Sequence, residues 1–160
     1  MTGAATGDRR RPDRMRYVFD TSALLALRGD ESGADEVEDL LSKSAEDRCS
    51  VLISFMTRME LLYIIRREEG EEAACQALSL LDTFSVEWVS CEPEILDAAA
   101  VLKAEGGLST ADAWIGATAI VREAVLVHCD PEFVAFKNIS QQFIGKSAET
   151  PHRPRNKRRH

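Results

Sequence analysis

Long hydrophobic runs are missing from this sequence. No apolar segment approaches the roughly 20 residues that a helix needs to cross a bilayer, and residues 1–16 are rich in Arg and lack the apolar core of a secretory signal. The few cysteines form no Cys-x-x-Cys pair, which argues against a zinc site or a disulfide framework; they are Cys49, Cys75, Cys91 and Cys129. We therefore expect a soluble, cytoplasmic protein with free thiols and no membrane association.

Positive charge is scarce in the central part of the chain. Residues 17–136 hold 8 Lys or Arg against 24 Asp or Glu, a net charge of −16, whereas residues 1–16 and 137–160 carry +3 and +6. An acidic body of this kind argues against a broad cationic groove for nucleic acid. It leaves open a nucleic-acid substrate that binds through metal ions and a basic tail.

The length of the chain sets its domain organisation. With 160 residues, 44% of them hydrophobic, the chain can form one well-cored domain and is too short for two comfortable ones. We expect a single domain over residues 15–144, between a disordered N-terminal extension (1–14) and a basic, disordered tail (145–160). Met15 stands just before the first predicted strand and is a candidate initiator.

Short apolar runs alternate with amphipathic segments along the chain. The apolar runs predict strands at residues 17–19, 51–54, 86–89 and 125–128, with a weak fifth at 138–144. The amphipathic segments predict helices at 22–28, 34–44, 56–69, 71–84, 93–104 and 110–123; the third carries Met59, Leu62 and Tyr63 at helical spacing. Strands that alternate with helices are typical of a parallel sheet covered on both faces. The predicted fold class is therefore α/β, a three-layer domain with a central, mostly parallel sheet of four or five strands.

The stretch from Tyr17 to Ala26 organises the rest of the chain. It reads as a short strand, then Asp20, then the hydroxyls of Thr21 and Ser22, which can cap the apolar helix that follows. An acid at such a strand-to-helix turn lies at the carboxyl edge of a parallel sheet, where α/β folds bind ligands. Asp at a strand end is also ordinary turn chemistry, so Asp20 alone decides nothing.

Three more acids stand in similar settings. Glu60 lies in the helix after the second strand, Asp112 lies in the first turn of the helix that Ser109 caps, and Asp130 follows the fourth strand. Each is isolated among apolar neighbours, whereas solvated acids in this chain come in runs such as residues 68–72. Because the ends of parallel strands share one edge of the sheet, we expect all four acids to converge there. Any one of them could instead be a helix cap or a solvent-facing acid.

Converging carboxylates need a counter-charge. Two carboxylates about 4 Å apart repel each other by about 4 kcal/mol at an effective dielectric constant near 20. Four of them with no Lys or Arg beside them in sequence must bind protons or a cation. Oxygen ligands without His or Cys suit a hard ion, Mg²⁺ or Mn²⁺, and such ions commonly serve phosphate chemistry.

These segments resemble a known family. The chain is similar to PIN-domain proteins, above all the VapC-type toxins, over roughly residues 16–144. The matching segments, in order, are Val18–Leu24, Ile53-Ser54, Glu60-Leu61, Leu108–Ala113, Gly116–Ala119, Asp130 and Glu132-Phe133. The Leu-Ser-x-Ala-Asp-Ala segment is fairly specific.

The resemblance implies both an activity and partners. It implies a Mg²⁺- or Mn²⁺-dependent endoribonuclease in which Asp20, Glu60, Asp112 and Asp130 are the catalytic and metal-binding residues. Hydrolysis of RNA would leave a 5′-phosphate and a 3′-hydroxyl. It also implies a homodimer and, for the toxins, a cognate protein antitoxin that blocks the site.

One departure from the family pattern leaves alternatives open. The family commonly has Thr or Ser two residues before its last acid, where this chain has His128. We interpret His128 as a residue accommodated at the strand end, although it could hydrogen-bond a phosphate or carboxylate. The departure permits a PIN-like module that binds RNA or protein without cutting. An aspartyl phosphatase with Asp20 as nucleophile is a weaker alternative, because Ser22 stands where such enzymes usually have a second acid. Arg66 and Arg67 are expected on a solvated helix face.

Overall fold

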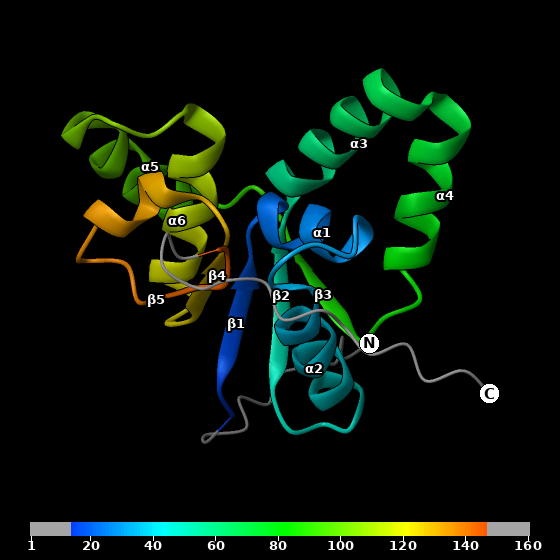
Figure 1. Ribbon diagram of the computed structural model, residues 1–160. Helices are drawn as coiled ribbons and strands as arrows, with labels where there is room; N and C mark the ends of the chain where they lie inside the picture. The colour runs from blue at the N-terminus through cyan, green and yellow to red at the C-terminus, as the bar shows by residue number, and fades with distance from the viewer. Residues whose placement is uncertain (1–13, 147–160) are drawn as a thin grey trace, which may run out of the picture.

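The computed structural model describes residues 14–146, which form a five-stranded sheet flanked by helices (Figure 1). In chain order the elements are β1 (Arg16–Phe19), α1 (Thr21–Arg28), α2 (Ala34–Ala45), β2 (Ser50–Ser54), α3 (Phe55–Glu69), α4 (Glu71–Leu81), β3 (Val86–Val89), α5 (Pro93–Glu105), α6 (Thr110–Val121), β4 (Val125–His128), the 3₁₀ helix η1 (Pro131–Ala135) and β5 (Gln141–Phe143). The predicted disorder at the two ends concerns residues 1–13 and 147–160, which lie outside the described residues. The domain boundaries at residues 15 and 144 stay predictions.

The sheet is parallel throughout, in the order β3-β2-β1-β4-β5. The α/β prediction is confirmed, and the weak fifth strand is real but only three residues long. β1 is central, and the chain leaves it toward β2 on one side and returns to it through β4 on the other. The end of β1 therefore lies at a switch point between the two directions of winding, where open α/β sheets place their ligand sites.

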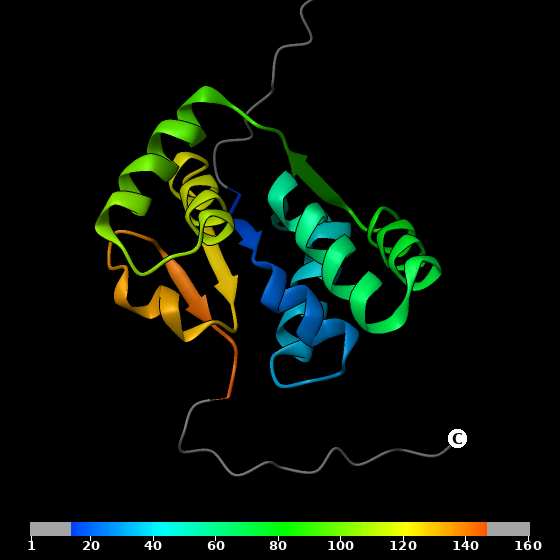
Figure 2. The same ribbon diagram turned by 90° about the horizontal axis from the view of Figure 1, so that it is seen from above.

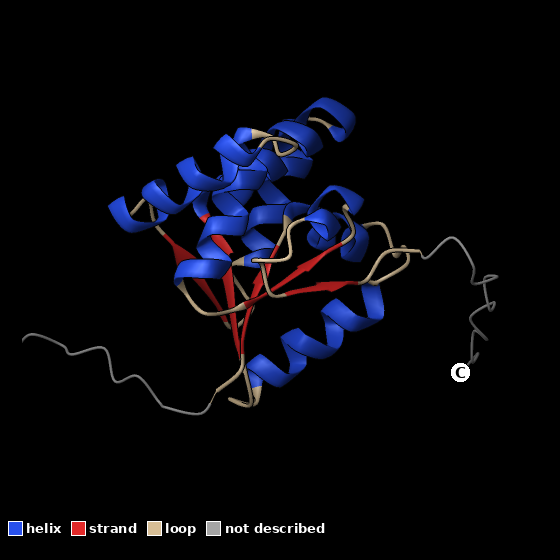
Figure 3. Cartoon of the chain, turned by 90° about the vertical axis from the view of Figure 1, so that its left-hand side faces the viewer, coloured by secondary structure: helices blue, strands red, loops and turns tan. Residues whose placement is uncertain are grey.

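Alternation along the strands creates two separate apolar cores. Val18, Leu52 and Leu126 point to one face of the sheet, where they pack against α5, α6 and the aromatic side chains of the η1 region. Phe19 and Val127 point to the other face and pack against α1, α2, α3 and α4. Figure 2 shows the resulting three layers, with α5 and α6 on one side of the strands and α1 to α4 on the other, and Figure 3 shows the strands in red among the helices. Burial of both faces explains why the strands read as continuous apolar runs.

Helix α3 buries a different face from the one that its apolar spacing suggests. Thr57, Leu61 and Ile65 are buried against the neighbouring helices, whereas Met59 is 46% exposed and Tyr63 is 42% exposed. One stripe suffices because α3 packs inward against α1 and sideways against α4. Large apolar side chains are therefore left on its outer surface.

The helices of the described region are too short or too polar to cross a bilayer. What the fold does provide is an edge at which several chain segments meet: the carboxyl ends of β1 and β4, and the first turns of α1, α3, α6 and η1.

Candidate active site

Asp20 occupies the end of the central strand. It is the N-cap of α1 and only 3% exposed. Its Oδ2 accepts hydrogen bonds from the Ser22 amide at 3.0 Å and from the Ser22 hydroxyl. The same hydroxyl accepts the Cys129 amide at 2.9 Å, so Ser22 ties the end of β1 to the end of β4. The other carboxylate oxygen, Oδ1, is buried and has no hydrogen-bond partner.

Glu60 approaches the same edge from α3. Thr21 donates its hydroxyl to Glu60 Oε1 at 2.8 Å, which links the first turn of α1 to the second turn of α3. The two hydroxyls that follow Asp20 thus have distinct partners: Ser22 fixes Asp20, and Thr21 fixes Glu60.

A tight group of three carboxylates completes the edge. Asp112, Asp130 and Glu132 each offer an oxygen within 4.8 Å of the others. Asp112 is in the first turn of α6, where its amide donates to the Ser109 hydroxyl at 3.1 Å. Asp130 caps η1, and its Oδ1 accepts the Glu132 amide at 2.9 Å.

Glu132 is the member that the sequence argument did not assign to the site. The segment Asp130-Pro131-Glu132 does contain a pattern that points to Glu132. Pro favours the first turn of a helix, and a helix cap followed by a tight turn places two residues that are two positions apart, here Asp130 and Glu132, on the same side of the chain. Periodicity does not reveal η1, because it is only five residues long, so Glu132 stands neither at a predicted strand end nor at a predicted helix start.

The electrostatics place all four predicted acids near one another. The pKa of Asp20 is raised to about 7, first by burial and then by the charges of Asp112 and Glu60, while the hydrogen bonds from Ser22 act to lower it. Burial, then the charges of Asp112 and Asp130, raise the pKa of Glu60, while the Thr21 hydrogen bond lowers it. Burial and the charge of Asp130 likewise raise the pKa of Asp112, against hydrogen bonds from Ser109. The structure therefore brings together Asp20, Glu60, Asp112 and Asp130, although only the last two belong to the 4.8 Å group.

This carboxylate site (Asp20, Glu60, Asp112, Asp130 and Glu132) has no cationic side chain in it. None of its members forms an ion pair with Lys or Arg within residues 14–146. Its donors are all oxygens, and one buried oxygen, Asp20 Oδ1, lacks a partner. A hard divalent ion fits these residues. Its positive charge would offset the negative charge of the carboxylates and lower their raised pKa values, and it would give Asp20 Oδ1 a ligand bond.

His128 is a structural residue and does not face the site. It is completely buried, and its ring packs edge-on against Phe133 and Phe143 with centroid distances of 5.1 and 5.6 Å. Its Nδ1 lies 2.8 Å from the Asp130 carbonyl oxygen and its Nε2 lies 2.9 Å from Gln141 Oε1. Burial lowers the pKa of His128, while both hydrogen bonds act to raise it. Contact with a substrate phosphate is excluded by this burial.

The contact between His128 and Gln141, which we call the His128–Gln141 bridge, is tied by Gln141 to the loop after β4. Its amide nitrogen donates to the carbonyl oxygens of Phe133 and Phe136 at 2.9 Å and of Ile139 at 3.4 Å. These bonds orient the amide so that its oxygen faces Nε2 of His128. The pair holds the segment that carries Asp130 against β4 and β5.

Comparison with known proteins supports one family. The PIN domain family model matches residues 17–139. No curated protein matches the chain.

Several solved structures share the fold. The VapBC2 complex from Rickettsia felis, bound to a DNA fragment from its promoter, is 19% identical with a TM-score of 0.67, covering 81% of this chain and 98% of that one. DNA-bound VapBC from Salmonella typhimurium is 18% identical with a TM-score of 0.65 and the same coverage. VapC20 from Mycobacterium tuberculosis, described as a toxin that cleaves the sarcin–ricin loop, is 18% identical with a TM-score of 0.61, covering 76% and 95%.

Asp20 makes the stability of the metal-free chain depend on pH. Its pKa is raised from 3.8 to about 7 in the folded chain, so the folded state holds this proton more tightly than the unfolded state. The free energy of unfolding therefore falls as the pH rises between these two values, by a few kcal/mol in all. We expect Asp20→Asn to remove most of this fall, as measured by urea unfolding in EDTA at about pH 5 and about pH 8.

The matched control is Asp97→Asn, which changes an exposed acid on α5 and should leave the pH dependence of the parent chain intact. An Asp20→Asn stability curve that runs parallel to that of the parent across this range would contradict the assignment.

The His128–Gln141 bridge predicts coupled substitutions. His128→Ala and Gln141→Ala should each destabilise the fold, and the double variant should lose less than the two losses added, with a coupling of about 0.5–3 kcal/mol. Gln142→Ala, one residue along and exposed, should be additive with His128→Ala. Urea unfolding of the parent and of these five variants (three single and two double) measures the coupling, and losses of stability that simply add for His128→Ala and Gln141→Ala would count against the bridge.

Proposed function

The chain belongs to the PIN domain family, and from that premise we propose that it is a metal-dependent endoribonuclease, the toxin of a toxin–antitoxin pair. The observation that carries the proposal is the carboxylate site, in which five acids converge with no Lys or Arg among them and one buried oxygen of Asp20 is left without a partner. Sites of this composition hold hard divalent ions.

The residues divide into ligands and supports. Asp20, Glu60, Asp112 and Asp130 would hold Mg²⁺ or Mn²⁺, with Glu132 beside them. When bound, the ion would lower the pKa of a water molecule and offset the charge that develops on the phosphate. Ser22 and Thr21 hold one oxygen of Asp20 and of Glu60 and leave the others to face the ion.

The geometry favours an anionic substrate once the ion is present. The N-terminal turns of α1 and α6 lie at the site, since Asp20 caps one and Asp112 is in the first turn of the other. The partial positive charge of helix N-termini stabilises carboxylates and phosphates there. Without the ion, five carboxylates would repel a phosphodiester. Metal binding is therefore the condition for substrate binding.

A protein antitoxin is part of the proposal. The structures from R. felis and S. typhimurium are of VapBC bound to DNA, and VapBC-5 from M. tuberculosis is described as a member of the VapBC family of toxin–antitoxin systems. In this chain, α1, α2, α3 and α4 border an apolar groove of about 590 Å³. Leu80 and Phe84 are large exposed side chains on its rim, and a groove of this kind suits an apolar segment of a protein partner. A homodimer and a cytoplasmic location are proposed from the resemblance.

RNA cleavage in the presence and absence of EDTA tests the activity. The full chain, freed of any bound partner, should cut single-stranded RNA with Mg²⁺ or Mn²⁺ and lose activity in EDTA. Asp20→Asn should lower the cleavage rate at least about 100-fold, since even outer-shell partners of a metal site cost 10–100-fold. Asp97→Asn should cut at the parent rate.

Cleavage that survives EDTA or Asp20→Asn would refute the mechanism. A parent chain that binds RNA or a protein partner but cuts no RNA under any divalent ion would establish the alternative, a non-catalytic PIN-like module.

A further inference from the structure

The chain leaves the described domain beside the carboxylate site. β5 runs parallel to β4, so the two strands end at the same edge of the sheet, as Figure 2 shows. Beyond β5, the Ile144 amide donates to the His128 carbonyl oxygen at 2.9 Å. A methyl group placed on Gly145 would lie 3.3 Å from the Cys129 carbonyl oxygen, and the next residue after Cys129 is Asp130. The residues that follow Gly145 therefore begin next to a member of the site.

The sequence that begins there is strongly basic. Residues 146–160, which we call the basic segment, contain one acid and six basic residues; the latter are Lys146, Arg153, Arg155, Lys157, Arg158 and Arg159. The PIN domain match ends at residue 139, so the basic segment lies beyond it. Its four arginines follow Gly145 by 8 to 14 residues. Because an extended chain covers roughly 3.3 Å per residue, even the first of them can return to the Asp112–Asp130–Glu132 group, whose oxygens lie within 4.8 Å of one another.

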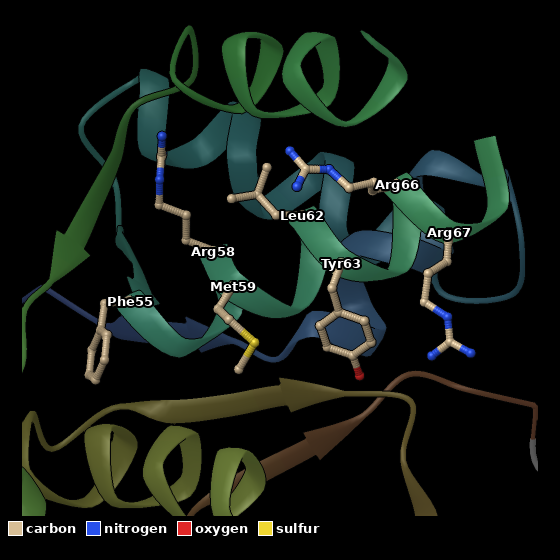
Figure 4. Close-up of a pocket in the computed structure, with 7 residues that line it drawn as sticks. All are labelled: Phe55, Arg58, Met59, Leu62, Tyr63, Arg66 and Arg67. Carbon is tan, nitrogen blue, oxygen red and sulfur yellow. The ribbon is translucent and has the colours of Figure 1, made fainter. Parts of the chain in front are cut away.

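The described domain does not supply the site with a cation. Asp20 is only 3% exposed, and its Oδ1 is buried without a hydrogen-bond partner. Three arginines surround the groove on the outer side of α3 that Figure 4 shows; they are Arg58, Arg66 and Arg67. Arg66 forms an exposed ion pair with Glu71 at 3.2 Å. Within residues 14–146, none of the three forms an ion pair with an acid of the site. The carboxylates therefore have room for a positive charge from outside the described domain.

We propose that the carboxylate site is also the docking surface of the basic segment, whose arginines bind the carboxylates of the same chain when no divalent ion is bound. Guanidinium groups bind carboxylates through paired, charge-assisted hydrogen bonds. Attachment through about ten residues gives the arginines an effective concentration at the site of the order of mM. The ion and the guanidinium groups require the same carboxylate oxygens, so they compete. This inference rests on the proposed function, because it concerns the same site and the same ion.

RNA is the other anion that a basic segment can bind. Two observations favour the carboxylate site over RNA as its partner. The site lies beside the point where the segment begins and is covalently linked to it, whereas RNA must be captured from solution. Residues 17–136 carry a net charge of −16, which attracts an attached cationic segment toward the domain. Binding of the segment to RNA is therefore an outcome that the test must separate.

Mn²⁺ binding measures this competition without any cleavage. The segment variant is the full-length chain with four changes, Arg153→Gln, Arg155→Gln, Arg158→Gln and Arg159→Gln. The electron paramagnetic resonance signal of free Mn²⁺ gives the Kd of the ion. At low salt the segment variant should bind Mn²⁺ about five- to tenfold more tightly than the parent, because in the parent two or more exposed ion pairs must first be broken. At about 1 M salt, where the Debye length is about 3 Å, the two chains should bind Mn²⁺ alike.

A variant with the same net charge and a peptide provide the controls. The control variant also loses four positive charges, all from ion pairs at the surface of the domain; its changes are Arg28→Gln, Lys43→Gln, Arg48→Gln and Arg66→Gln. It should bind Mn²⁺ within about twofold of the parent. A synthetic peptide of residues 146–160, added at mM concentration to the segment variant, should weaken its Mn²⁺ binding again. The same peptide with its four arginines replaced by Gln should have no effect.

Four results would overturn the proposal. They are equal Mn²⁺ affinity of the parent and the segment variant at low salt, equal tightening in the control variant, a difference that persists undiminished at 1 M salt, and a parent Kd that rises with chain concentration. The last result would assign the contact to a second copy of the chain.

Two further measurements separate this inference from the proposed function. A segment variant with an unchanged Mn²⁺ Kd but weaker RNA binding by fluorescence anisotropy would assign the segment to RNA and refute the docking. Parent and segment variant that bind Mn²⁺ equally and both cleave RNA refute only this inference. Chains that bind no Mn²⁺ at the site and cleave no RNA refute the proposed function as well.

Discussion

The burial and crowding of carboxylates at one edge of the sheet is the constraint on which this structure depends. Packing on both faces of the sheet fixes β1 beside β4, and this fixes Asp20 and Asp130 at neighbouring strand ends. α3 and α6 bring Glu60 and Asp112 to the same place, where burial first, and then the charges of the neighbouring acids, raise the pKa of Asp20, Glu60 and Asp112. A fold selected for stability alone would not bury Asp20 with an unpartnered oxygen. The unfavourable free energy of burying this carboxylate is offset if a divalent ion completes the site.

Hydroxyl groups and one buried bridge make the arrangement rigid. Ser22 and Thr21 each hold one carboxylate oxygen, and Ser22 also binds the backbone after β4. The buried His128–Gln141 bridge holds the loop that carries Asp130, because His128 also contacts the Asp130 carbonyl oxygen. Each support occupies one oxygen or one backbone group and leaves the face toward the site open. Preorganised ligands of this kind are what a metal site requires.

Much of this could be predicted from the sequence, because apolar periodicity and strand-end acids follow directly from burial. The strands, the parallel sheet and the convergence of four acids came from such local patterns. Glu132 was missed because its turn, η1, is too short to have a periodicity. The exposed side of α3 was missed because spacing alone cannot say which of two apolar stripes is buried; the answer depends on α1 and α4. The role of His128 depends on Gln141, 13 residues away, and no local pattern pairs them.

The location of a bound ion tests the central claim most directly. Anomalous diffraction from crystals of the chain grown with Mn²⁺ would place the metal without reference to activity. The account predicts a peak at ligand distance, roughly 2.0–2.3 Å, from Asp20 Oδ1 and from at least one carboxylate of the Asp112–Asp130–Glu132 group. Full-length crystals that bind Mn²⁺ elsewhere, or that leave Asp20 Oδ1 without an ion at saturating Mn²⁺, would contradict it.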